Sequence, residues 1–160
     1  MRIGFGYDSH VFAEDRPLKL GGVLVPFPRG LKGHSDADVV IHALIDALLG
    51  AAALGDIGSH FPDDGAEWKN ADSALLLKKV VEEIRAAGYE IGNVDVTVVC
   101  EQPKLRPYVD AIRSRLGEIM RVPVASVSVK GKTNEGMDAV GEGRGIAVYA
   151  VALLKCAVGD

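Results

Sequence analysis

The apolar residues of this chain recur with two different periods, and each period predicts a different kind of element. Residues 2–10 alternate with a period of two, as a strand with one buried face does. Alternation, or a short apolar run bounded by turn residues, also predicts further strands. These are a hairpin over residues 18–26 and single strands over 91–100, 127–130 and 146–154.

Three other stretches have the 3.6-residue period of a helix. The first follows a turn at residues 30–33, with Ser35 and Asp36 as candidate N-cap residues. It runs to about Ala53 and is apolar nearly all round, so we expect it to be buried. The other two are predicted after Asp72, up to Gly88, and after Pro107.

The order of these elements is typical of an α+β domain in which helices pack on one face of a mixed β-sheet. We expect one domain, residues 1–160, because about 150 residues is an ordinary domain length. The last strand is apolar on both faces, so the second face of the sheet must be buried as well. In a chain this short, the cover that we expect is another subunit.

Composition excludes several classes of partner. The net charge of −4 gives no electrostatic support for binding nucleic acid. No apolar run reaches the roughly 18 residues that a membrane helix needs, so we expect no membrane partner. The two cysteines, Cys100 and Cys156, form no metal or redox motif. Strand-like alternation begins at Arg2, which predicts no signal peptide. We therefore expect a cytoplasmic protein, or one of the plastid stroma in a plant or alga.

Polar residues on the buried helix suggest chemistry. Asp38, His42 and Asp46 recur at intervals of four and so fall on one stripe. One interpretation is a narrow solvated edge of an amphipathic helix. The other is that His42 binds a metal, with Asp38 or Asp46 orienting its ring.

The first strand supplies two further candidate ligands. Asp8 and His10 share one face near its end, although an Asp-x-His sequence in a turn often has no function. With His42 they would make two imidazoles and one carboxylate. Three protein ligands and one open position are typical of a catalytic zinc site, where the metal polarises a phosphoryl oxygen or activates water.

Charged loops indicate an anionic, phosphorylated ligand. Lys104, Lys132 and Thr133 follow predicted strands, and His34 precedes a helix N-terminus that would favour an anion. Glu135 is either an ion-pair partner of Lys132 or a ligand for a harder ion such as magnesium. The residues therefore predict a metal-dependent enzyme that acts on a phosphorylated small molecule. Hydrolysis and internal phosphoryl transfer both remain open.

Several motifs, spread over nearly the whole chain from Met1 to Leu154, resemble those of one enzyme family. They are Gly6-Tyr7-Asp8-Ser9-His10, the stretch from Gly33-His34-Ser35-Asp36-Ala37-Asp38 to His42-Ala43-Leu44, Gly55-Asp56-Ile57-Gly58, Phe61-Pro62-Asp63 and Gln102-Pro103-Lys104-Leu105. Together they resemble the 2-C-methyl-D-erythritol 2,4-cyclodiphosphate synthase family.

The resemblance implies a lyase of the non-mevalonate route to isoprenoids. Its substrate is 4-diphosphocytidyl-2-C-methyl-D-erythritol 2-phosphate. The 2-phosphate attacks the β-phosphorus, CMP leaves, and the cyclic diphosphate closes. The resemblance also implies a homotrimer, with active sites between neighbouring subunits and the second face of the sheet buried inside the trimer.

The same resemblance implies the roles of individual residues. Asp8, His10 and His42 would hold one zinc ion per subunit, and Glu135 would help hold magnesium or manganese on the substrate. His34 and Thr133 correspond to catalytic positions that stabilise the transition state. The implied substrate-binding positions are Asp8, Ser9, His10, His34, Ser35, His42, Asp56, Ile57, Gly58, Phe61, Pro62, Asp63, Asp64, Gly65, Cys100, Glu101, Gln102, Pro103, Lys104, Leu105, Arg106, Lys132, Thr133, Asn134 and Glu135.

Two departures from the family pattern stand out. Lys132 and Asn134 replace threonines that many relatives have, which adds a cation near the phosphates. In some relatives an arginine is associated with an isoprenoid-diphosphate site on the trimer axis. Here that arginine is displaced to Arg144, beside Glu142, so the sequence does not predict whether this chain has such a site. Two alternatives to the synthase also remain: a zinc-dependent phosphohydrolase with the same three ligands, and a trimeric binding module with a structural metal.

Overall fold

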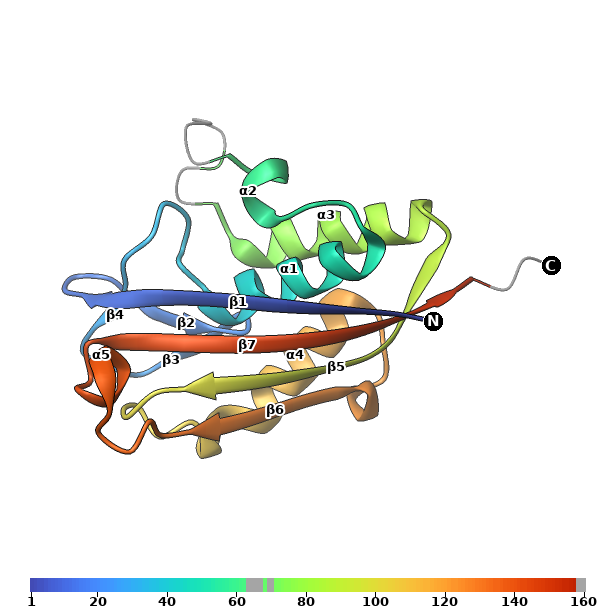
Figure 1. Ribbon diagram of the computed structural model, residues 1–160. Helices are drawn as coiled ribbons and strands as arrows, with labels where there is room; N and C mark the ends of the chain where they lie inside the picture. Colours follow the sequence, from blue (N-terminus) through green and yellow to red (C-terminus); the bar gives the residue numbers. More distant parts are fainter. Residues whose placement is uncertain (63–67, 69–70, 158–160) are drawn as a thin grey trace.

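The computed structural model describes residues 1–62, 68 and 71–157, and its central feature is a five-stranded sheet (Figure 1). Its strands lie in the order β4-β1-β7-β5-β6. Only β5 and β6 run parallel, so the predicted mixed sheet is confirmed. The strands are β1 (Arg2–Ala13), β4 (Gly30–Leu31), β5 (Tyr89–Val99), β6 (Val127–Lys132) and β7 (Gly145–Cys156).

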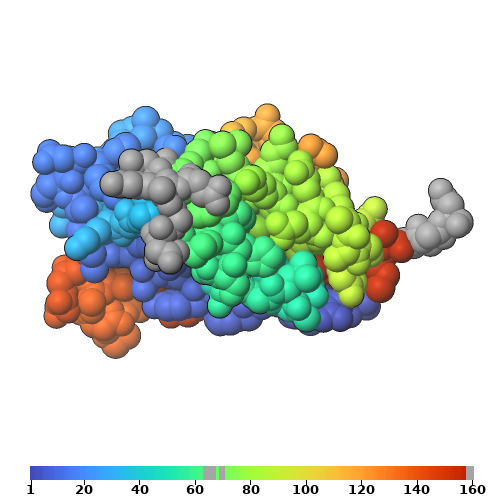
Figure 2. All heavy atoms as spheres, turned by 90° about the horizontal axis from the view of Figure 1, so that it is seen from above, coloured from blue at the N-terminus to red at the C-terminus, as the bar shows by residue number. Residues whose placement is uncertain are grey.

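Three long helices cover one face of this sheet, as the sequence predicts. Figure 1 shows the long strands in front of α1 and α4, and Figure 2 shows the molecule from above, with α3 in green beside the N-terminal loops in blue. The long helices are α1 (Val39–Ala52), α3 (Ser73–Ala86) and α4 (Val109–Met120). The smaller elements are the hairpin of β2 (Leu18–Leu20) and β3 (Val23–Val25), the short helices α2 (Ile57–His60) and α5 (Asp138–Gly141), and the 3₁₀ turns η2 (Arg106–Tyr108) and η3 (Val124–Ser126).

Glycines on β1 allow α1 to lie directly against the sheet. A Cβ atom on Gly4 would stand 1.9 Å from the carbonyl oxygen of Ala47, and one on Gly6 would stand 2.0 Å from that of Ala43. Real Cβ atoms never approach a backbone so closely, so both positions require glycine. This close approach brings the N-terminal half of α1 beside the end of β1, where Asp8 and His10 lie.

Two predictions about local structure were wrong. Helix α1 begins after Asp38, whose carboxylate accepts from the backbone N–H of Ile41, and not after Ser35 or Asp36. Ala37, with a φ of 58°, turns the chain between those residues and the helix. The loop predicted over residues 55–65 also contains the short helix α2, which Asp56 caps by accepting from the N–H of Ser59.

The second face of the sheet is open in the single chain. Its exposed apolar side chains come from β1 and β7, and their exposed fractions are 73% for Ile3, 63% for Phe5, 48% for Tyr7, 43% for Tyr149 and 41% for Val151. Tyr7 and Tyr149 face each other across the two strands with ring centroids 5.1 Å apart. This open face is the one that we expect another subunit to cover.

None of the helices in the described ranges is long and apolar enough to cross a bilayer.

Candidate metal centre and active site

Asp8, His10 and His42 converge where the second half of β1 meets the first turns of α1. The Nε2 atom of His10 lies 3.0 Å from Oδ2 of Asp8, and the Nδ1 atom of His42 lies 3.1 Å from the same oxygen. The two imidazole nitrogens are 3.3 Å apart. Two residues of one strand and one residue of a helix 32 positions later thus present one donor atom each to a common point.

These distances fit a zinc ion. Ligands that lie 2.0–2.1 Å from a tetrahedral ion are about 3.3 Å from one another. The three observed separations lie close to that value, and the donors are the nitrogens and the carboxylate oxygen that zinc accepts. Three protein donors leave one tetrahedral position for an oxygen of substrate or water, as the sequence predicts.

The carboxylate of Asp8 is held in its charged form. Burial alone would raise the pKa of Asp8, but hydrogen bonds from His10 and His42 outweigh burial and lower this pKa far below its usual value. Burial opposes protonation of His10, but the hydrogen bond to Asp8 outweighs burial and raises the pKa of His10. Asp8 therefore offers a stable negative charge to a cation, while a proton on His10 competes with a metal for that ring.

His42 is oriented by hydroxyl groups, and the expectation that Asp38 or Asp46 orients it was wrong. Its Nε2 atom lies 3.1 Å from Oγ of Ser35 and 3.0 Å from Oγ of Ser73. Asp46 instead accepts from the N–H of Ile57.

Asp38 has a role in the scaffold and does not form the solvated helix edge that we considered. Its carboxylate is fully buried and accepts from the backbone N–H groups of Gly21 and Gly22, in addition to that of Ile41. Burial raises the pKa of Asp38 in spite of these three donors. Asp38 thus ties the β2–β3 turn to the start of α1.

A cavity of about 670 Å³ opens beside the three candidate ligands. It brings together eight residues that the sequence predicts for the site, from β1, α1, α2 and the loops before them: Asp8, His10, His34, Ser35, His42, Ile57, Gly58 and Phe61. Lys32, Trp68 and Leu76 also line it and were not predicted, and so does Asp46, which was named only as a candidate to orient His42. Trp68 packs edge-on against Phe61, a contact that no local sequence pattern signals. The predicted residues Asp63, Asp64 and Gly65 lie outside the described residues.

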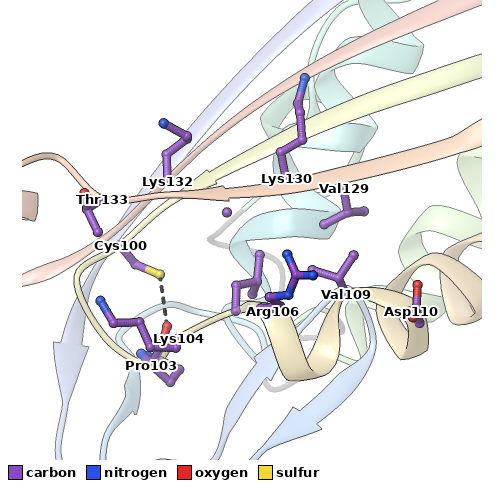
Figure 3. Close-up of a pocket in the computed structure, with 12 residues that line it drawn as sticks. Cys100, Pro103, Lys104, Arg106, Val109, Asp110, Val129, Lys130, Lys132 and Thr133 are labelled. Atoms are coloured by element: carbon purple, nitrogen blue, oxygen red, sulfur yellow. Dashed lines mark hydrogen bonds between the residues drawn. The ribbon is translucent and has the colours of Figure 1, made fainter.

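A second cavity, of about 590 Å³, lies between the end of β6 and the turn η2 (Figure 3). Seven predicted residues line it: Cys100, Pro103, Lys104, Leu105, Arg106, Lys132 and Thr133. In Figure 3 Lys130 and Lys132 project from β6 on the side away from the loop that carries Lys104 and Arg106, and Lys130 is paired with Asp95 at 2.5 Å. Cations among the lining residues favour an anionic occupant.

Cys100 lines this second cavity and has a structural role there. Its thiol donates to the carbonyl oxygen of Pro103 at 3.5 Å (Figure 3). Burial raises the pKa of Cys100 to about 11, so the thiol stays neutral and unreactive near pH 7.

Glu135 contacts Thr133, and not Lys132, in the loop after β6. The hydroxyl of Thr133 donates to Oε1 of Glu135 at 2.6 Å, and the neighbouring Glu101 accepts from the backbone N–H of Asn134. No ion pair between Glu135 and Lys132 occurs within the ranges that the structure describes. The carboxylate of Glu135 is therefore exposed in the loop after Thr133, the last residue that lines the second cavity.

The two cavities share no lining residue among those described. His34 lines the first and Thr133 lines the second, so one chain does not bring the two predicted catalytic residues together. Of the other predicted positions, Ser9, Asp56, Pro62, Glu101, Gln102, Asn134 and Glu135 line neither cavity. Arg144 forms an ion pair with Glu142 at 2.8 Å.

Comparison with known proteins identifies the family. A family model described as the YgbB family matches residues 1–155. The chain belongs to the YgbB family. One relative, the 2-C-methyl-D-erythritol 2,4-cyclodiphosphate synthase of Brachyspira hyodysenteriae, is 57% identical over 97% of this chain and 98% of its own length. The synthase of Salinibacter ruber is 57% identical over 98% of this chain and 100% of its own.

A solved structure supports the same assignment. A 2C-methyl-D-erythritol-2,4-cyclodiphosphate synthase in a form bound to CDP superposes with a TM-score of 0.89. It is 39% identical to this chain, and the match covers 96% of this chain and 100% of that structure. The resemblance that the motifs predict is thus confirmed.

Proposed function

We propose that the protein converts 4-diphosphocytidyl-2-C-methyl-D-erythritol 2-phosphate into 2-C-methyl-D-erythritol 2,4-cyclodiphosphate and CMP. It is a phosphorus–oxygen lyase of the non-mevalonate isoprenoid pathway. The observation that carries this proposal is the cluster of Asp8, His10 and His42. It occurs in a chain that aligns over nearly its full length with 2-C-methyl-D-erythritol 2,4-cyclodiphosphate synthases. The reaction needs an in-line approach and charge neutralisation, and it needs no protein nucleophile.

Asp8, His10 and His42 hold one zinc ion in this proposal. Bound there, zinc would polarise a phosphoryl oxygen of the diphosphate. His34 lines the same cavity, on the loop just before α1, and contacts the phosphoryl group as its charge changes. Ile57, Gly58 and Phe61 form the wall against which the methylerythritol part lies.

The second cavity takes the cytidine diphosphate group. Lys104 and Lys132 supply cations for its phosphates, and the loop from Cys100 to Arg106 surrounds the nucleoside. Thr133 contacts a phosphoryl oxygen, and Glu135 helps to hold magnesium or manganese there. A carboxylate beside phosphate oxygens suits these harder ions.

The complete site forms between subunits of a homotrimer. Two observations support this assembly: the two cavities are separate in one chain, and the sheet leaves Ile3, Phe5, Tyr7, Tyr149 and Val151 exposed on its second face. Packing three such faces together would bury these side chains. It would also allow the first cavity of one subunit to adjoin the second cavity of its neighbour, uniting His34 with Thr133.

Phosphorus NMR of the zinc- and magnesium-loaded protein with the proposed substrate tests this function. We expect CMP and a cyclic diphosphate to appear together, without inorganic phosphate. Release of inorganic phosphate alone would favour a zinc-dependent phosphohydrolase, and an unchanged substrate would favour a binding module. His42→Ala serves as the control that removes one zinc ligand and should abolish product formation.

A further inference from the structure

A chain of partly buried hydrogen bonds connects the ring of His42 to two charged residues outside the metal cavity. The Nε2 atom of His42 lies 3.0 Å from Oγ of Ser73, the first residue of α3. The Ser73 hydroxyl donates to Oδ1 of Asp36. Lys19, on β2, donates to Oδ2 of Asp36 at 3.2 Å. Ser73 is fully buried.

The chemistry of these groups sets the direction of each proton. An ionised carboxylate can only accept, so the single hydroxyl proton of Ser73 is committed to Asp36. The oxygen of Ser73 can then only accept from His42, which requires a proton on Nε2. Without a metal, Nδ1 can donate a proton to Asp8; when a metal takes the place of that proton, the ring keeps one proton, on Nε2, and the lone pair of Nδ1 faces the point shared with Asp8 and His10. This is the tautomer that a metal at Nδ1 requires.

Asp36 is built to stay ionised. Burial would raise its pKa, but hydrogen bonds from Ser73 and Lys19 outweigh burial and lower the pKa of Asp36. The backbone N–H groups of Ser73 and Asp38 also point at its two oxygens, each at 3.3 Å. All four of these groups donate hydrogen bonds to the Asp36 carboxylate, which favours its ionised form.

Ser35 cannot perform the same task alone. Its Oγ atom lies 3.1 Å from Nε2 of His42, but it accepts from the N–H of Ala37 and contacts no carboxylate within the described residues. Its hydroxyl proton is therefore free to rotate, and it pairs with either tautomer of the ring.

We propose that Ser73 and Asp36, with Lys19, are positioning residues that hold His42 in its Nε2–H tautomer and so strengthen zinc binding at Asp8, His10 and His42. This inference rests on the zinc site of the proposed function and adds three residues to it. Partners that orient metal-binding histidines in this way typically contribute 10–100-fold to metal affinity.

Asp36→Asn is the most informative variant, because it reverses the direction of the hydrogen bonds that run from His42 through Ser73 to residue 36. An amide nitrogen at the Oδ2 position would face two donors, Lys19 and the N–H of Ser73. The Oδ1 position faces only one backbone donor, the N–H of Asp38, so the amide turns its nitrogen toward the Ser73 hydroxyl there, which can become an acceptor. Ser73 then donates to Nε2 of His42, and the ring proton moves to Nδ1, where it blocks the metal.

Ser73→Ala removes the hydrogen bonds between His42 and Asp36 without reversing their direction. Ser35 still accepts from Nε2–H of His42. The matched control is Asp72→Asn, the same substitution at the N-cap of α3, 3.9 Å from Lys19. Asparagine is as good an N-cap as aspartate, and Asp72 makes no contact with His42 or Ser73's hydroxyl in the bonds described.

The test is the zinc dissociation constant of each purified protein, measured by competition with a chromophoric chelator, together with the thermal midpoint of the zinc-free form. We expect zinc to bind about 10-fold more weakly to Ser73→Ala and about 100-fold more weakly to Asp36→Asn, with Asp72→Asn unchanged. Adding Asp36→Asn to Ser73→Ala should cause no further loss, because the chain passes through Ser73.

Zinc affinities of Ser73→Ala and Asp36→Asn within twofold of the wild type would overturn the inference. Equal losses in Asp36→Asn and Asp72→Asn would overturn it too, since they would show a general charge effect. If Asp36→Asn does not fold, Ser73→Ala and its affinity decide the question. Failure of the wild type itself to bind zinc, with His42→Ala indistinguishable from it, would instead contradict the proposed zinc site.

Discussion

Gly6 of β1 lies so close to Ala43 of α1 that a methyl group on Gly6 would stand 2.0 Å from the Ala43 carbonyl oxygen. Ala43 is the neighbour of His42, and Gly6 is two residues before Asp8. The same contact that packs the helix on the sheet therefore sets the separation between the candidate metal ligands of the two elements. Packing and metal binding depend on one backbone-to-backbone distance.

Gly6→Ala should damage both stability and metal binding. The new methyl group meets backbone atoms that cannot rotate away, so we expect a loss of about 3 kcal/mol or more in the free energy of unfolding, measured by urea titration. Gly50→Ala is the matched control on α1, where a new Cβ finds only one atom within 4 Å, at 3.9 Å. It should stabilise the protein by roughly 0.5–1 kcal/mol. Equal effects of the two changes would contradict this account.

Removal of zinc should abolish turnover but leave the fold. The hydrophobic core, built around the buried face of α1, contains none of the three ligands. Dialysis against a chelator should therefore lower the thermal midpoint only slightly, and His42→Ala should unfold near the temperature of the zinc-free wild type. A collapse of secondary structure on chelation, seen by circular dichroism, would indicate a structural metal instead.

The ion pair of Asp8 and His10 should stabilise the zinc-free protein only within a limited pH range. The pKa of Asp8 is lowered from 3.8, so its contribution is present above about pH 3.8 and is lost as the pH falls through its folded value. The pKa of His10 is raised from 6.5, so its contribution is present below about pH 6.5 and is lost as the pH rises through its folded value.

The difference in thermal midpoint between zinc-free wild type and Asp8→Asn should therefore be largest between about pH 4 and pH 6.5 and should shrink at higher pH. Zinc affinity should change in the opposite direction and rise with pH, since protons and zinc compete for His10. A stability difference that grows above pH 7 would contradict the assigned pKa directions.

Assembly should depend on the exposed face of β1 and β7. Tyr7→Glu places a charge in the middle of the apolar face and should convert a trimer into monomers in light scattering after size-exclusion chromatography. Leu75→Glu is the control, because Leu75 is 59% exposed on α3, away from that face. A Tyr7→Glu protein that remains trimeric would show that the subunits meet elsewhere.

The sequence predicts the parts of the site that depend on local patterns. Alternation along β1 places Asp8 and His10 on one face, and helical period places His42 on α1, so these three candidate ligands could be named without a structure. The apolar pattern likewise predicts the long strands and helices. A strand or helix can be predicted in this way because its apolar residues recur with a fixed period over adjacent positions.

The parts that were not predicted depend on contacts between distant segments. Ser73 meets His42 across 31 positions, and no periodicity relates a hydroxyl on one helix to a ring on another. The role given to Asp38 was wrong because the turn at Ala37 makes it the N-cap, where backbone N–H groups compete for its carboxylate. Helix α2 was missed because its four residues are too few to show a period.

The two faces of β1 have a consequence for how this strand can change during evolution. Odd-numbered Ile3, Phe5 and Tyr7 face the open side, while Gly4, Gly6, Asp8 and His10 face α1 and the metal cavity. Inserting or deleting one residue would exchange the two sets, because strand side chains alternate. Such a change would place the aromatic rings against α1 and move both ligands to the outer side. A point substitution changes one side of the strand, and is costly at Gly4, Gly6, Asp8 and His10, whereas a length change disturbs both sides at once; we therefore expect length changes to fall before Arg2 or after Ala13.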